Sequence, residues 1–165
     1  MTPSRAEPSR MEELIEAHSS EAIRLAYLLT GDQELSRDIA QDAFVRLFSR
    51  FRHKAAPDAF RTYLRSTIVN LTRDQWRRRR SARAYEAINR RKKPQIAELP
   101  PIEERDELWV ALQHVPMRQR AALVLRYYED LSEQQAADVL GCSVGAVKGL
   151  VTRGTQAMRK ALEEK

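Results

Sequence analysis

Basic and amide side chains near the C-terminus have the types and spacing that recognise the edges of DNA bases. Lys148, Arg153 and Gln156 lie in a stretch whose apolar residues recur at helical spacing, so they share its outer side. Arginine can engage guanine with two hydrogen bonds, and lysine can reach the same acceptors less rigidly. An ordinary helical hairpin with a basic outer face is the alternative that this pattern leaves open. The apolar residues expected to face the core are Leu140, Val144, Val147 and Leu150.

The surrounding elements predict how these side chains are positioned. Residues 131–162 have the pattern of a short helix, a tight turn and a second helix, which is the layout of a helix-turn-helix that places its second helix in the major groove. Gly141 can take the positive φ that ends the first helix, and Ser143 is a good N-cap for the second. The residues predicted to face DNA are Ser143, Ala146, Lys148, Gly149, Thr152, Arg153 and Gln156.

A second basic cluster lies in the middle of the chain. The segment 73–93 contains ten basic residues opposed only by Asp74 and Glu86, a net charge of +8 in a chain whose total is +6. A solvated helix end is the plainer explanation, but the consecutive arginines 77–80 repel one another without a counter-charge. The cluster therefore suggests a polyanionic partner, and nucleic acid is favoured over a membrane because no bulky apolar face accompanies it.

Composition limits the fold and the class of protein. Glycine is scarce, with 5 residues, while Ala, Leu, Arg, Glu and Gln dominate, which favours an all-α protein. Cys142 is the single cysteine, so an intrachain disulfide and a cysteine-rich metal site are excluded. No run of about 18 apolar residues and no leader segment is present, so we expect a cytoplasmic protein without membrane insertion. We also expect no enzyme activity and no cofactor or metal, because no carboxylate cluster or paired nucleophile is evident.

Periodicity and proline content divide the chain into two small helical domains joined by a flexible linker. Residues 1–9 are expected to be disordered, 10–87 and 102–165 to form the domains, and 88–101 to form the linker, which holds three prolines. Pro116 suits a first helical position, and Ser132 with Gln135 resembles a capping box. Helices are predicted over 10–30, 32–51, from about 59 into the arginine cluster, 102–115, 116–128, 132–140 and 143–163.

Three stretches, in this order, resemble the sigma-70 family of bacterial RNA polymerase sigma factors. LAYLLTGDQELSRDIAQDAFVRLFSRF (25–51) is similar to the family's core-binding stretch, and AFRTYLRSTIVNLTRDQWRRRR (59–80) to the part that opens and reads the −10 element. Residues 99–154 resemble region 4 and include the run P-x-x-x-R-x-x-x-x-L-R-Y-Y-E-D-L-S. The chain is most similar to the two-domain extracytoplasmic-function (ECF) group, which keeps only regions 2 and 4.

The resemblance implies a role for each group of residues. In the family, the D-x-x-Q-[DE]-x-F pattern docks on the clamp helices of the polymerase β′ subunit, and region 4 docks on the β flap. The residues that match the docking pattern are Asp38, Gln41, Asp42 and Phe44. In the family, an Asn matching Asn70 helps to hold a base flipped out of the −10 element. The residues predicted to bind the −10 element are Tyr63, Asn70, Arg73, Trp76, Arg77, Arg78, Arg79 and Arg80.

The family also implies core RNA polymerase, promoter DNA and an anti-sigma factor as partners. One departure concerns Lys148, which the family often follows with Ser-Arg and this chain follows with Gly149-Leu150, so the −35 specificity of relatives does not transfer.

Two other classes of protein are alternatives for this sequence. A stand-alone helix-turn-helix regulator explains residues 102–165 but gives no role to the acidic pattern at 38–44 or to the arginine run. A nuclease would need the carboxylate cluster or activated nucleophile that the sequence does not offer.

Overall fold

The computed structural model describes residues 10–50, 57–89 and 107–164, and every regular element among them is helical. The expected disordered N-terminus and most of the expected linker lie outside the described residues. The helices are α1 (Arg10–Thr30), α2 (Gln33–Arg50), α3 (Pro57–Asn89), α4 (Glu107–Gln113), α5 (Met117–Leu123), the π-helix η2 (Val124–Tyr128), α6 (Glu133–Leu140) and α7 (Val144–Glu163). The all-α fold class is confirmed, although α3 includes the first two residues of the predicted linker.

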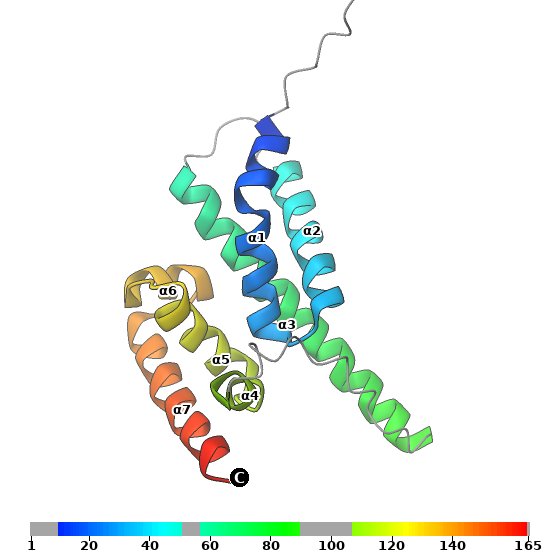
Figure 1. Ribbon diagram of the computed structural model, residues 1–165, viewed down its shortest axis with the longest axis vertical. Coiled ribbons are helices and arrows are strands. Elements are labelled where there is room, and N and C mark those ends of the chain that lie inside the picture. The colour runs from blue at the N-terminus through cyan, green and yellow to red at the C-terminus, as the bar shows by residue number, and fades with distance from the viewer. Residues whose placement is uncertain (1–9, 51–56, 90–106, 165) are drawn as a thin grey trace, which may run out of the picture.

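The first three helices pack around one apolar core (Figure 1). Their apolar residues recur every three or four positions, so each helix has one face to bury. Leu29, Ile68 and Leu47 are almost fully buried, and Phe60 is 3 % exposed between α1 and α2. The opposite face of α2 is exposed to solvent.

The remaining helices form a second layer in which α5 and α7 approach closely. At Gly154 in α7, an added Cβ would lie 2.9 Å from Leu123 Cδ1, so the absence of a side chain allows the contact. The single helix predicted for 116–128 is wrong in detail. Pro116 is the N-cap and not the first helical residue, and the last turn widens into η2.

The widened turn redirects the chain toward α6. The Glu129 N–H donates to the Val124 carbonyl at 2.9 Å, a spacing of five residues, and Asp130 then adopts a left-handed φ of 54°. The Arg126 guanidinium donates to the Leu131 carbonyl across this bend. Arg126 thus stabilises the bend that leads into α6.

The two groups of helices also pack against each other. α1 contacts α4, α5 and η2, while α3 contacts α5 and α6. The rings of Tyr27 and Trp109 stack with centroids 5.8 Å apart, and the Gln113 amide donates to the Leu28 carbonyl at 3.1 Å. The buried core is therefore continuous between them.

The close approach at Gly154 gives a test of the packing. Gly154→Ala should lower the free energy of unfolding by about 1–3 kcal/mol, because the new methyl group would force Leu123 to move. Gly149→Ala in the same helix meets only ordinary contacts and should raise stability by up to about 1 kcal/mol through helix propensity. Urea unfolding of both variants measures the difference, and equal effects would contradict the close α5–α7 contact.

Candidate nucleic-acid interface

α6, the turn and α7 form the predicted helix-turn-helix, with the predicted caps. The Ser132 hydroxyl accepts from the Gln135 N–H at 3.1 Å, and the Gln135 side chain accepts from the Ser132 N–H at 2.9 Å, which completes a capping box. Gly141 has the expected left-handed φ of 64°. The Ser143 hydroxyl accepts from the Ala146 N–H at 3.1 Å and begins α7. Local side chains thus fix the start and direction of the second helix.

The outer side of α7 carries the side chains predicted to face DNA. Val147 and Leu150 are buried against α6 and α5, which turns Lys148, Thr152 and Arg153 toward solvent. Ser143, Ala146 and Gln156 are also exposed. The basic and amide groups therefore share one accessible face, as a helix in a major groove requires.

Two of these residues are held by neighbours. The Lys148 ammonium lies 3.6 Å from the Glu133 carboxylate at the start of α6, with the Lys148 side chain exposed and the Glu133 side chain partly exposed. Gly149 is half-buried because the Arg153 guanidinium lies over it, 3.6 Å from where a Cβ would be. A solvent-accessible ion pair of this kind contributes little stability, so Lys148 can reorient toward a base or a phosphate.

The middle of α3 presents aromatic and amide groups for the predicted −10 site. Tyr63, Asn70 and Arg77 are seven residues apart, so they fall on one side of the helix. Tyr63 is 45 % exposed and Trp76 is 41 % exposed, large values for aromatic side chains. Exposed aromatic rings beside cationic groups are the combination that binds single-stranded nucleic acid.

The arginine run is not uniform. Residues 77–80 are all exposed, but Arg79 also donates to the Asp32 carboxylate at 3.1 Å. Burial raises the pKa of Asp32, but the Leu35 N–H and the Arg79 guanidinium outweigh this, so its pKa is lowered.

Arg73, from the same predicted set, is half-buried. Its Nε atom is buried without a hydrogen-bond partner in the part of the chain that the structure describes. It is therefore less available to DNA than the exposed arginines further along α3.

The predicted polymerase-docking residues divide into surface and core. Asp38, Gln41 and Asp42 are exposed on one side of α2, as their spacing predicts. Phe44 is only 5 % exposed and stacks with Phe48 and Phe60, so little of its ring is accessible to a partner in this structure. Its ring anchors α2 in the core, from which the acidic residues project.

Sequence reasoning missed an apolar residue on this face. Val45 is 63 % exposed and lies four residues after Gln41 and seven after Asp38. This spacing could have revealed Val45 from the sequence, because it places a β-branched apolar residue on an otherwise polar helix face, which is unusual. Val45 adds an exposed apolar side chain to the acidic surface.

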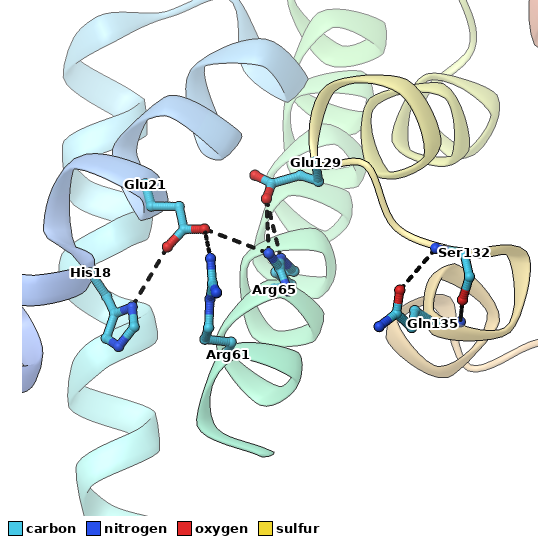
Figure 2. A network of polar contacts seen from close by, with 7 residues as sticks. All are labelled: His18, Glu21, Arg61, Arg65, Glu129, Ser132 and Gln135. Carbon is cyan, nitrogen blue, oxygen red and sulfur yellow. Dashed lines mark hydrogen bonds and ion pairs between the residues drawn. The ribbon is translucent and has the colours of Figure 1, made fainter. Parts of the chain in front are cut away.

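Sequence reasoning also missed a polar network between distant helices, shown in Figure 2. Glu21 pairs with Arg61 at 2.5 Å and with Arg65 at 3.5 Å, and Arg65 pairs with Glu129 at 3.0 Å. Burial raises the pKa of Glu21, but hydrogen bonding and charge from Arg61 outweigh it, and the pKa is lowered. These partners are far apart in sequence, so no local pattern pairs them.

The described segments contain neither a membrane-spanning helix nor a cluster of metal-binding side chains. Within 10–50, 57–89 and 107–164, no helix has the length and apolar content needed to cross a bilayer. The same residues contain no group of three or more His, Cys, Asp or Glu side chains arranged to hold a metal ion.

Comparison with known proteins defines the class to which this arrangement belongs. Residues 14–82 match the model of sigma-70 region 2, and residues 105–158 match that of sigma-70 region 4. The chain therefore belongs to the sigma-70 family of RNA polymerase sigma factors, with the two regions characteristic of the ECF group.

Individual relatives agree with this assignment. The chain is 33 % identical to the ECF RNA polymerase sigma factor SigE of Mycolicibacterium smegmatis over 92 % of its own length, and spans 61 % of that protein. It is 28 % identical to an RNA polymerase sigma-E factor of Streptomyces avermitilis, over 93 % of its own length and 86 % of the relative. Its fold matches a chain in the complex of sigma factor RpoE with anti-sigma factor NepR from Bartonella quintana, with a TM-score of 0.72, 18 % identity and coverage of 94 % and 98 %.

The N-cap of α7, Ser143, should contribute to the stability of the helices that form the interface. Ser143→Ala removes the acceptor for the Ala146 N–H and should destabilise the second group of helices by about 1 kcal/mol. Thr152→Ala is the matched control, because the Thr152 hydroxyl donates to the Lys148 carbonyl inside the same helix and caps nothing. Thermal unfolding should separate the two variants, and an unchanged midpoint for Ser143→Ala would contradict the capping role.

Proposed function

We propose that this chain binds core RNA polymerase, directs it to promoters by reading −35 and −10 elements, and promotes opening of the DNA. The observation that carries the proposal is the presence in one sigma-70 chain of two different exposed faces, one basic on α7 and one aromatic and cationic on α3. α7 offers a basic helical face suited to duplex DNA, and α3 offers exposed aromatic and cationic groups suited to single strands. We assign the chain no catalytic step of its own.

For the −35 element, we propose that α7 enters the major groove. Lys148 and Arg153 are the candidates for contact with guanine or with phosphate, and Thr152 and Gln156 lie close enough to assist. The bare surface at Gly149 lets the Arg153 guanidinium lie along the helix before it binds. The buried Val147 and Leu150 keep this face in register with α6.

For the −10 element, we propose that α3 binds the separated strand. Unstacking a base costs a few kcal/mol, so the protein must replace the lost stacking and hydrogen bonds. Tyr63 and Trp76 supply exposed rings, and the Asn70 amide supplies both a donor and an acceptor. The exposed arginines at 77, 78 and 80 neutralise the phosphates of the opened DNA.

For polymerase, we propose that the acidic side of α2 docks on a basic surface, the clamp helices of the β′ subunit. Asp38, Gln41 and Asp42 supply the charge and hydrogen bonds, and Val45 supplies an apolar contact. Region 4 docks on the β flap. An acidic patch steers association with a basic partner and fixes its orientation.

We also propose an anti-sigma factor as a regulatory partner. Support comes from the Bartonella quintana RpoE complex, which shares this fold and contains the anti-sigma factor NepR.

A stand-alone DNA-binding regulator is not favoured, because it leaves region 2 and the acidic side of α2 without a role.

The decisive test is run-off transcription with purified protein and core polymerase on genomic fragments. Discrete transcripts that require this protein would support the proposal, and their start sites would reveal the two promoter elements. No transcripts, together with no co-elution of the protein with core polymerase, would contradict it and restore the stand-alone regulator.

Loss of a base-reading side chain should impair transcription and leave polymerase binding intact. Lys148→Ala or Arg153→Ala should each reduce promoter-dependent transcription about tenfold, since one good base contact is worth about 1–3 kcal/mol. Co-elution with core polymerase should not change, because both side chains lie on α7 and the acidic face lies on α2. Arg159→Ala, further along α7, is the matched control. Loss of core binding in either test variant would refute their assignment.

Asn70 should act at the opened strand. Asn70→Ala should reduce transcription from duplex promoters about tenfold, because hydrogen bonds to the unstacked base are lost. On a template already unpaired across the −10 element the defect should be smaller, since strand separation no longer costs free energy. Equal defects on both templates would argue against a role of Asn70 in opening.

A further inference from the structure

An acidic side chain of α6 lies on the surface proposed to read the −35 element. Glu133 is the first residue of α6, and its carboxylate lies 3.6 Å from the Lys148 ammonium on the exposed side of α7. The Glu133 side chain is 38 % exposed, so solvent reaches it beside the lysine. Because the two charges are this close, DNA that contacts Lys148 also meets the Glu133 carboxylate.

The start of α6 does not depend on a carboxylate at position 133. Ser132 and Gln135 already cap the helix, since each side chain accepts from the backbone N–H of the other residue (Figure 2). A negative charge in the first turn interacts favourably with the helix dipole, but an uncharged residue there would leave the capping box intact. The closest charged partner of Glu133, Lys148, therefore indicates its role better than the helix does.

The two basic side chains proposed to read the −35 element are held differently. In the part of the chain that the structure describes, the Arg153 guanidinium pairs with no carboxylate and lies over Gly149. Lys148 has a flexible stem of four carbons, and Glu133 holds its charged end. A lysine without such a partner can bind a phosphate of any sequence. Glu133 thus restricts the basic group that would otherwise contribute least to sequence recognition.

The carboxylate distinguishes a phosphate from the edge of a base. A phosphate that approaches Lys148 comes close to the negative charge of Glu133 and is repelled, whereas O6 and N7 of guanine carry no net charge. An ammonium has three N–H groups, so one can turn toward Glu133 while the others donate to guanine. The pair contributes little in solvent, but it interacts more strongly where DNA displaces the surrounding water.

We propose that Glu133 is a specificity-determining residue of the −35 surface, which directs Lys148 to the edges of bases and away from phosphates. This inference rests on the proposed function. Glu133 acts through Lys148, so it is a positioning residue. It lowers the affinity of the chain for duplex DNA of any sequence and raises the preference for the −35 element.

The first experiment measures how Glu133→Gln changes the binding of the full-length chain to a duplex of random sequence at several salt concentrations. Lys148 should become available to a phosphate, so the affinity should rise, and the logarithm of the affinity should fall more steeply with the logarithm of salt concentration, by about 0.9. An unchanged slope would overturn the proposal.

Asp138→Asn is the matched control for this experiment. It removes the same charge from an exposed position of α6, where the Gln134 amide donates to the Asp138 carboxylate at 3.0 Å. Asp138 lies five residues after Glu133 and thus on a different side of the helix. An equal change of slope in the two variants would mean that net charge alone is responsible, and it would refute the role of the Glu133–Lys148 pair.

The second experiment measures specificity in the complex with core polymerase. Two duplexes are compared, a promoter found by run-off transcription and the same promoter with its −35 element replaced. The ratio of the two affinities should fall about fivefold in Glu133→Gln, because Lys148 is no longer directed to its base. An unchanged ratio would contradict a role of Glu133 in specificity.

A double variant tests whether Glu133 acts through Lys148. In a Lys148→Ala background, Glu133→Gln should change neither the salt slope nor the affinity ratio, because the group that Glu133 positions is absent. In an Arg153→Ala background the effect of Glu133→Gln on the salt slope should persist. A full effect without Lys148 would show that the carboxylate acts on DNA directly, and the positioning role would be wrong.

The inference and the proposed function fail in different ways. If the chain co-elutes with core polymerase and directs transcription, but Glu133→Gln changes neither the slope nor the ratio, the role of Glu133 is overturned and the sigma-factor function stands. If the chain neither co-elutes with core polymerase nor directs transcription, the proposed function fails, and with it the role of Glu133 at a −35 element.

Discussion

The buried guanidinium of Arg120 is the interaction on which the rest of the structure depends. It donates to carbonyls at the end of α4, in the turn before α5 and in the last turn of α1. A charge this deep in a protein is tolerated only because several oxygens replace its hydration. The planar fork of arginine suits this task better than lysine, because it points several donors in fixed directions. Arg120 therefore stabilises both the angle between α4 and α5 and the packing of region 4 on region 2.

The amphipathic helices bury one side in the core and expose the other side to possible partners. On α2, Phe44 and Leu47 are buried, and this orients Asp38 and Asp42 outward. On α7, Val147 and Leu150 do the same for the basic side chains. The surfaces proposed to bind polymerase and DNA are thus consequences of core packing, because a rigid helix cannot turn one side inward without presenting the other. Substitutions in the core would therefore change the orientation of the exposed side chains.

The parts of the site that could be predicted depend on residues that are close together in the sequence. The caps at Ser132, Gly141 and Ser143 involve atoms within a few residues, so the sequence specifies them directly. Phe44 could not be placed in the same way, because its family pattern does not distinguish a contact residue from the anchor behind it. The π-helical turn at the end of α5 was also missed, since nothing in the apolar spacing marks a single wider turn.

The sequence by itself determined the all-α class, the helix-turn-helix with its caps, and which side of each helix is polar. It could do so because these features depend on residues within one or two helical turns. The tertiary structure decided the pairing of Arg79 with Asp32, the pairing of Arg65 with Glu129, and the packing of the two regions. Those contacts join residues dozens of positions apart, and the charges at either end have many possible partners until the helices are packed.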